Sequence, residues 1–413
     1  MDPKILLLST NDIQGGAARA AYRLHQGLRM QGLDTQMLVQ FQESDDPDVI
    51  SSQGFWPQIS AWTRAYLDVI PLQFYPHRTQ SYFSTQWVPD PFLRIIHNLN
   101  PDIVNLHWIS GGFLHFENLA RIKQPMVWTL HDMWAFTGGC HYNGGCEYYF
   151  NSCGRCPQLG SQHSRDLSFR GWQRKQRIYP DINLTLVTPS AWLAEETRCS
   201  PLLEGKRVEV IPNGLDLDLF QPRDKSFARD IFNLPQEKRI ILFGAQQASK
   251  SRKGGDLLQE TISLLTKMEG TDHYELVLFG KGISELNYDF PVHQVGLLRD
   301  QLSLNLLYSA ADVFVAPSRQ DNLPNTIMEA LACGTPCAGF TIGGVPEMID
   351  HRINGYTAQP FDTGELARGL KWILEDNERW ESLSKAAREK AVREYDQEVQ
   401  TSRYRDLFRA LLT

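Results

Sequence analysis

The chain is 413 residues long, with 42% hydrophobic residues, 22% charged residues and a formal net charge of −7. This composition is typical of globular proteins and excludes a disordered or fibrous chain. The acidic balance argues against a nucleic-acid partner, because such binding needs a basic face that neutralises phosphates. The length suits two domains of about 200 residues each. With no apolar run near the ~20 residues that span a membrane and no signal-peptide pattern, we expect a cytoplasmic protein with reduced thiols.

Short apolar segments alternate with helical patterns along the chain. The first strand is predicted over 5–9, followed by Gly15-Gly16 and a helix that buries Ala21, Leu24 and Leu28 and ends at Gly32. Further strands are predicted over 36–41, 103–107, 126–130, 184–188, 208–211, 240–243, 275–279, 313–316 and 337–340. Repeated strand–helix units predict an α/β protein with parallel sheets and helices on both faces.

A turn at Pro212-Asn213-Gly214 marks the expected domain boundary, because it follows a strand and precedes a polar, proline-containing stretch. We place an N-terminal domain at 1–213 and a C-terminal domain at 214–390. The charged residues from 377 onward predict two helices with a break near Tyr395-Asp396, and we expect 391–413 to pack back on the N-terminal domain.

Two segments of the N-terminal half allow alternative interpretations. The region 55–87 is rich in aromatic residues, which either fill a core or form a wall for an acceptor or a membrane interface. The stretch 163–177 concentrates Arg165, Arg170, Arg174, Lys175 and Arg177. It is either a solvated surface helix or a docking face for an anionic acceptor or a lipid headgroup.

The most informative segment is 316–336, which reads as strand, loop, helix, glycine stop and strand. Ligands of open α/β sheets bind at the carboxyl edge of the strands, where this loop lies. The amides of a helix N-terminus favour phosphate, so 322–326 can offer backbone donors to a diphosphate. Asp321 precedes the helix and Glu329 lies inside it, and both carboxylates can accept hydrogen bonds from sugar or ribose hydroxyls.

The pattern Ser-x-x-acid-Asn-x-Pro-x-x-x-x-Glu-Ala-x-Ala-x-Gly-x-Pro, over 318–336, resembles the hallmark of family 4 retaining glycosyltransferases. The resemblance implies a GT-B fold of two Rossmann-like domains facing across a cleft, with acceptor in the first domain and nucleotide-sugar donor in the second. It is strongest to the exopolysaccharide and colanic-acid branch. By this resemblance Asp321, where the family usually has Glu, contacts the donor sugar and Glu329 the ribose.

Further residues extend the resemblance. Gly15 and Gly16 resemble the family's glycine loop, and His131 after a strand resembles its sugar-contacting histidine. Arg252 and Lys253 resemble its basic diphosphate site, and Leu298 falls near the nucleobase. The donor-binding residues implied are therefore Gly15, Gly16, Arg252, Lys253, Leu298, Asn322, Leu323, Pro324, Asn325 and Thr326, with His131, Asp321 and Glu329 as catalytic residues. Because these groups neutralise the leaving diphosphate, we expect catalysis without a metal, and we discount the Asp216-Leu217-Asp218 match to a metal motif.

Four of the seven cysteines lie within 17 residues, at Cys140, Cys146, Cys153 and Cys156. In a reducing compartment such a cluster favours a structural zinc site, with two disulfides or free thiols as the alternatives. Four thiolate ligands would close the coordination shell, so this zinc would clamp a loop and take no part in catalysis.

The predicted reaction moves a sugar from a nucleoside-diphosphate-sugar to a hydroxyl of a glycan or lipid-linked oligosaccharide, with peripheral contact to the inner face of the plasma membrane. Three rival functions remain: a sugar phosphorylase or nucleotide-sugar epimerase on the same fold, a catalytically weak partner subunit, and an NAD-linked oxidoreductase. The absence of a Gly-x-Gly-x-x-Gly fingerprint counts against the last.

Overall fold

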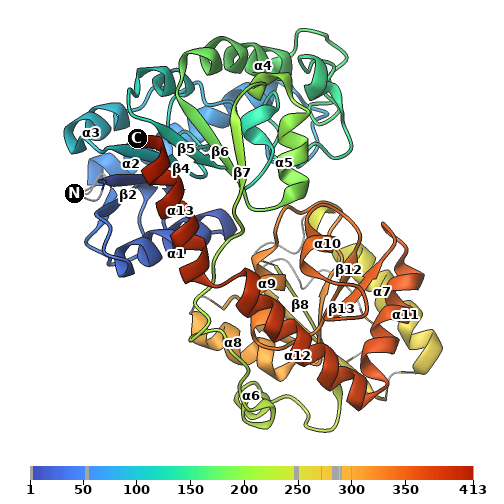
Figure 1. The fold of residues 1–413 in the computed structure, drawn as a ribbon. Coiled ribbons are helices and arrows are strands. Elements are labelled where there is room, and N and C mark those ends of the chain that lie inside the picture. Colours follow the sequence, from blue (N-terminus) through green and yellow to red (C-terminus); the bar gives the residue numbers. More distant parts are fainter. Residues whose placement is uncertain are drawn as a thin grey trace. The chain divides into compact units, whose positions relative to one another are not determined.

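The computed structural model describes residues 3–51, 55–245, 251–270, 272–280, 288, 291–298 and 300–412. The chain divides into two compact units, each built around a parallel sheet (Figure 1). Unit 1 consists of Met1–Pro212 and Gln400–Thr413, and unit 2 of Asn213–Val399. Among the described residues no helix has the length and apolar character needed to cross a membrane.

Unit 1 contains a seven-stranded sheet in the order β3-β2-β1-β4-β5-β6-β7, with every neighbouring pair parallel. Its strands are β1 (Ile5–Asn11), β2 (Thr35–Phe41), β3 (Val49–Ser51), β4 (Ile103–Leu106), β5 (Met126–Thr129), β6 (Leu184–Thr188) and β7 (Arg207–Val210). Its α-helices are α1 (Gly16–Met30), α2 (Phe55–Val69), α3 (Phe92–Leu99), α4 (Leu167–Ile178) and α5 (Ala191–Arg198), joined by most of α13 (Gln397–Leu412).

Unit 2 contains a six-stranded parallel sheet in the order β10-β9-β8-β11-β12-β13. Its strands are β8 (Arg239–Ala245), β9 (Tyr274–Gly280), β10 (Val292–Gly296), β11 (Val313–Ala316), β12 (Cys337–Phe340) and β13 (Gly355–Ala358). Its helices are α6 (Lys225–Ile231), α7 (Gly255–Glu269), α8 (Gln301–Ala310), α9 (Asn325–Ala332), α10 (Val345–Met348), α11 (Thr363–Leu374) and α12 (Asn377–Glu394).

Apolar side chains cover both faces of each sheet, as expected for strands buried on two sides. In unit 1, Leu6 and Leu8 of β1 join one core, whereas Ile5 and Leu7 join another. The second core includes Tyr404 of α13, whose hydroxyl lies 2.9 Å from Oγ1 of Thr129. The sequence is thus anchored at its C-terminal end to the first sheet by burial of an amphipathic helix.

Each sheet has one point where the strand order reverses. In unit 1 the chain continues from β1 to β2 on one side and then returns to β4 on the other, and in unit 2 β8 lies between β9 and β11 in the same way. Loops that leave neighbouring strands in opposite directions open a crevice at the carboxyl ends of those strands, where ligands bind in open α/β sheets. The loops after β1, β4 and β5 and those after β8 and β11 are therefore the places to look for a site.

Candidate active site

The loop after β11 carries Asp321 and leads into α9. The Asp321 side chain is buried, and its Oδ2 lies 2.6 Å from Nζ of Lys253 and 3.3 Å from NH1 of Arg252. Its Oδ1 accepts a hydrogen bond from the backbone N–H of Asn322. The structure thus brings Asp321 together with two basic residues, of which the nearer in sequence, Lys253, is 68 residues away.

Electrostatics favour the charged form of this aspartate. Burial opposes ionisation of Asp321, but the charges of Lys253 and Arg252 outweigh burial and hold its pKa below the ordinary value. Burial also lowers the pKa of Lys253, against the opposing effect of Asp321. Together these groups form a fixed, partly dehydrated cluster of charge, which acts more strongly on a bound ligand than it would in water.

A glycine sets the position of the basic loop. Gly254 has φ of 70°, and a Cβ atom there would lie 1.9 Å from the carbonyl oxygen of Pro317 at the end of β11. The loop is also fastened by a hydrogen bond from the N–H of Arg319 to the carbonyl of Arg252, at 2.8 Å. Only glycine allows this close approach, which places Lys253 beside Asp321.

The opposite side of the Asp321 loop is braced by a second glycine turn. Gly343 has φ of 52°, and a Cβ atom there would lie 1.9 Å from the carbonyl oxygen of Asp321. The N–H of Gly344 donates to the same oxygen at 3.1 Å. This turn therefore supports the backbone of the Asp321 loop directly.

The start of α9 follows immediately. Pro324 occupies the N-cap position, and its side chain supplies no cap to the helix. Leu323 packs into the core of unit 2, and Oδ1 of Asn325 accepts a hydrogen bond from Nδ2 of Asn213 at 3.2 Å. The backbone around Thr326 in the first turn carries the positive end of the helix dipole, which favours an anion near it.

Glu329 lies about one turn into α9 and is only 2% exposed. The hydroxyl of Tyr308 on α8 donates to its Oε2 at 3.1 Å. A buried carboxylate requires such partners, because an ion without hydrogen bonds is costly away from water. Tyr308 is a supporting residue that the sequence pattern did not reveal.

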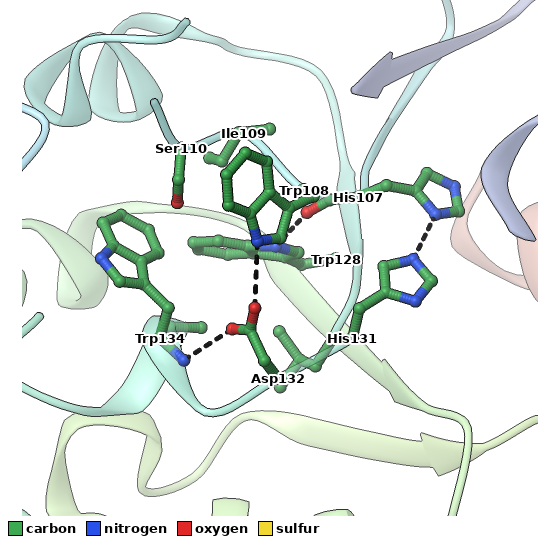
Figure 2. A pocket seen from close by; sticks show the side chains of 10 residues that line it. His107, Trp108, Ile109, Ser110, Trp128, His131, Asp132 and Trp134 are labelled. Atoms are coloured by element: carbon green, nitrogen blue, oxygen red, sulfur yellow. Dashed lines mark hydrogen bonds between the residues drawn. The ribbon is translucent and has the colours of Figure 1, made fainter. Parts of the chain in front are cut away.

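In unit 1 a cluster of rings lines a small cavity of about 10 Å³ after β4 and β5 (Figure 2). Nδ1 of His107 lies 3.0 Å from Nε2 of His131, and Nε2 of His107 lies 3.2 Å from Oδ1 of Asn105. Burial lowers the pKa of His131 to about 4 and lowers that of His107 well below its ordinary value. Both imidazoles are therefore neutral near pH 7.

Asp132 follows His131 in the sequence, but its side chain contacts other residues. Its Oδ2 lies 2.6 Å from Nδ1 of His141 and accepts a hydrogen bond from the indole N–H of Trp108 at 3.0 Å. Its Oδ1 accepts from the N–H of Trp134 (Figure 2). Oγ of Ser84 lies 2.8 Å from Nε2 of His141, so a Ser–His–Asp chain is formed.

This chain does not have the setting of a nucleophilic triad. Ser84 and His141 are buried, and Ser84 does not line the cavity beside Asp132. A nucleophilic serine needs space for its substrate within hydrogen-bond reach. The arrangement instead fixes the loop that follows His131.

Two regions that together span most of the chain match known protein families. Residues 14–219 match the family Glycosyltransferase Family 4, and residues 237–376 match the family Glycosyl transferases group 1. The chain belongs to the family 4 glycosyltransferases. The family and the GT-B fold that the Asp321–Glu329 motif predicts are thereby confirmed. This glycosyltransferase uses a nucleotide-sugar donor.

Relatives of the glycosyltransferase span several pathways. WcaC of Escherichia coli (strain K12), named for colanic acid biosynthesis, is 23% identical over 349 residues, which cover 80% of this chain and 82% of WcaC. A D-inositol 3-phosphate glycosyltransferase of Thermobispora bispora is 27% identical over 314 residues, covering 71% of this chain and 67% of the relative. These identities establish distant kinship and leave substrates to be found by experiment.

Solved structures share the whole fold. Sucrose-phosphate synthase from Thermosynechococcus elongatus has a TM-score of 0.69 and 18% identity, and the similarity covers 99% of both chains. Anabaena HepE in complex with UDP and glucose has a TM-score of 0.65 and 15% identity, over 99% of this chain and 100% of that one. At such identities the likeness is one of fold.

The other residues predicted to bind the donor follow the strands β1 and β10. Gly15, with φ of 106°, is the N-cap of α1, and Gly16 is its first residue. Leu298 follows β10 and packs partly buried against the core of unit 2. The Asp216-Leu217-Asp218 segment is a turn in which Oδ1 of Asp216 accepts hydrogen bonds from the N–H groups of Asp218 and Leu219.

The cysteine cluster does not support the zinc expectation. All seven cysteines lie in the described part of the chain, and each is a free thiol, so the disulfide alternative is absent there as well. Across the described ranges no group of three or more His, Cys, Asp or Glu side chains is arranged to hold a metal ion. Burial raises the pKa of Cys140 to about 12 and also raises that of Cys146, Cys153 and Cys156. The four residues fit protonated thiols, of which Cys156 is buried and the other three are partly buried.

The two ambiguous segments each divide between surface and interior. Trp62, Tyr66 and Phe74 are 68%, 63% and 80% exposed and form a surface, whereas Phe83 is 7% exposed and lies in a core. In the basic stretch, Arg174 is paired with Glu117 and Lys175 is buried over the ring of Trp134. Arg174 and Lys175 are thus held by groups of the protein itself. The exposed basic residues left for a docking face are Arg165, Arg170 and Arg177.

Proposed function

We propose that this enzyme is a metal-independent retaining glycosyltransferase of polysaccharide biosynthesis, with its donor site at the switch point of the second sheet. The observation that carries the proposal is the convergence of Lys253 and Arg252 on Asp321 at the start of α9. Two cations and a helix N-terminus provide the positive environment that a leaving diphosphate requires. The adjacent carboxylates provide acceptors for hydroxyl groups.

The roles follow from the chemistry of each group. Lys253 and Arg252, with the backbone from Asn322 to Thr326, hold the diphosphate and stabilise the charge that develops as the sugar leaves. Asp321 accepts hydrogen bonds from the sugar and Glu329 from the ribose, and His131 is proposed as a further contact of the sugar. Catalysis then rests on positioning and on charge stabilisation, with the leaving phosphate assisting removal of the acceptor's proton.

A turnover assay tests this function. The wild-type protein is incubated with UDP-, GDP-, ADP- and TDP-sugars, and released nucleotide is measured with and without glycan acceptors. We expect one nucleotide class to support transfer, and we expect Glu329→Gln to reduce it while Glu381→Gln, at an exposed position on α12, does not. A requirement for inorganic phosphate would favour a phosphorylase, and sugar conversion without acceptor an epimerase. Absence of turnover with every donor would favour a partner subunit.

For the acceptor we propose a lipid-linked oligosaccharide reached at a membrane surface. Ile59, Trp62, Tyr66 and Val69 follow the helical spacing of three and four residues along α2, and each is at least 41% exposed. Phe74 extends this apolar face beyond the helix. An aromatic-rich helix face of this kind inserts favourably between lipid headgroups.

Vesicle flotation tests the acceptor proposal. We expect the wild-type protein to float with phospholipid vesicles and a Trp62→Ser/Tyr66→Ser variant to remain in solution. Ile353→Ser removes a 61% exposed apolar side chain elsewhere and should leave flotation unchanged. Equal transfer to soluble sugars, together with indifference to vesicles, would contradict the proposal.

A further inference from the structure

Three polar side chains at the carboxyl ends of β4 and β5 form one hydrogen-bonded series that ends at His131. Asn105 lies in β4 and faces His107, which follows that strand. His131 follows β5, and Figure 2 shows its ring hydrogen-bonded to that of His107. Asn105 and His107 are buried, so their protons are dictated by their protein neighbours. The series can therefore be read atom by atom.

The orientation of the Asn105 amide is fixed first. One terminal atom of its side chain lies 3.0 Å from the carbonyl oxygen of Val127 and 3.2 Å from Oγ1 of Thr129. A carbonyl oxygen has no proton to donate, so the atom that faces it must be the NH₂ group. The other terminal atom, which faces His107, is therefore the acceptor oxygen Oδ1.

This orientation determines the tautomer of His107. Its Nε2 lies 3.2 Å from Oδ1 of Asn105 and must carry the proton, because two acceptors facing each other would repel. Since burial lowers its pKa, the ring is neutral, and its Nδ1 is left as an acceptor. The partner of that Nδ1, at 3.0 Å, is Nε2 of His131, which must therefore be the donor.

We propose that Asn105 and His107 are positioning residues that hold His131 in the Nε2–H tautomer, so that every hydrogen bond made by its Nδ1 is one that it accepts. This inference rests on the proposed function, in which His131 contacts the donor sugar. A sugar hydroxyl can donate to Nδ1, whereas a carboxylate or carbonyl oxygen at that position cannot. The series thus selects a donor sugar that presents a hydroxyl to His131.

The first test is the tautomeric state of the wild-type protein. Histidine labelled with ¹⁵N allows long-range ¹H–¹⁵N spectra to distinguish Nδ1–H from Nε2–H rings, and variants at the two positions assign the signals. We expect both His107 and His131 to be Nε2–H tautomers at pH 7. An Nδ1–H ring at either position would overturn the inference, whatever the activity of the protein.

A matched pair of variants tests the link to turnover. His107→Asn places an amide oxygen near the former Nδ1 and can still accept from His131, whereas His107→Gln places its amide near the former Nε2 and cannot. We expect kcat/KM for the donor to fall about tenfold further in the Gln variant, the value of one hydrogen bond, with mixed tautomers at His131. Equal activity and unchanged tautomers in both variants would contradict the positioning role.

His131 itself separates this inference from the proposed function. We expect His131→Asn, whose amide oxygen replaces an Nδ1 acceptor, to retain more activity than His131→Gln. Suppose that wild type shows the assigned tautomers but that His131→Ala turns over the donor as fast as wild type. His131 would then not contact the sugar, and the proposed selection of a sugar hydroxyl would be overturned. If no variant or wild-type protein turned over any donor, the proposed function itself would fail, and the tautomer spectra would still report on the series.

Discussion

The substitution Gly254→Ala tests how the position of the basic loop, which carries Arg252 and Lys253, affects function while its charge stays the same. Gly254 is the N-cap of α7 and separates Lys253 from the helix, and its φ of 70° lies in the left-handed region. The added Cβ would lie 1.9 Å from the carbonyl oxygen of Pro317. Neither Lys253 nor Arg252 changes, so any loss of function must come from displacement.

Two contributions make up the expected effect. A residue other than glycine in the left-handed region costs about 1–2 kcal/mol of stability. The clash adds to this, because real Cβ contacts stay beyond 3.0 Å and the loop must therefore move by about 1 Å. A misplacement of about 1 Å at catalytic groups costs up to roughly a hundredfold in rate, so we expect kcat/KM for the donor to fall by one to two orders of magnitude.

The other end of the same helix supplies the control. Gly270 is the C-cap of α7 with φ of 76°, and a Cβ there would meet no atom within 4 Å. Gly270→Ala therefore carries backbone strain from a positive φ, in a conformation that also favours glycine, without the clash. We would compare donor kcat/KM and urea unfolding of both variants with wild type. Equal donor kinetics in Gly254→Ala and Gly270→Ala would refute the claim that the Gly254 contact positions the site.

Three further predictions concern charge, acidity and metal. Lys253→Met removes a charge-assisted contact worth about 1.5–3 kcal/mol, so donor kcat/KM should fall roughly ten- to a hundredfold. The control Lys385→Met, at an exposed position on α12, should leave donor kcat/KM unchanged. Equal kinetics in the two variants would count against a phosphate-binding role for Lys253. Burial lowers the pKa of His25 to about 4, so below pH 6.5 the unfolded chain takes up a proton that the folded chain refuses. Stability should fall between pH 6.5 and 4 by up to about 3 kcal/mol from this group, and urea unfolding of His25→Gln should show a shallower fall; an identical slope would contradict this sign. Turnover should resist EDTA, since Lys253, Arg252 and α9 neutralise the diphosphate, and a loss restored by Mg²⁺ would contradict that.

Much of the fold could be predicted because its central strands are apolar on both faces. The central strands of each sheet follow the predicted ranges closely. The three missed strands, β3, β10 and β13, all lie at sheet edges. Edge strands are shorter or less buried than central strands, so their hydrophobic pattern in the sequence is weak. In β10, for example, alternate positions face solvent.

The strand–loop–helix arrangement of β11 and α9 could be predicted because its signals lie in one continuous segment. Asp321 and Glu329 lie on a strand–loop–helix whose glycine stop and prolines mark its boundaries. The convergence of Lys253 with Asp321 was not a property of either segment alone, since it depends on the neighbouring positions of β8 and β11 in the sheet.

The network around His131 shows where sequence reasoning reached its limit. Successive side chains at a strand end point in different directions, so two neighbours in the sequence need not share a partner. Asp132 therefore serves His141, while His131 meets His107 across neighbouring strands. Long-range pairs of this kind leave no mark in the spacing of a single sequence. The cysteine spacing, in contrast, predicted a zinc site that the structure does not support, because the described residues hold no metal-binding arrangement of side chains.

The central claim is that unit 2 binds a nucleoside-diphosphate-sugar through Asp321, Glu329 and the basic loop. Its most direct test is the melting temperature of the protein against UDP-, GDP-, ADP- and TDP-sugars, because a ligand at a hundred times its Kd stabilises the native state by about 2.7 kcal/mol. We predict that one nucleotide class raises the melting temperature of wild type and that the rise shrinks in Asp321→Ala and Glu329→Ala. A rise of equal size in both variants, or none with any donor in wild type, would contradict the donor site described for this enzyme.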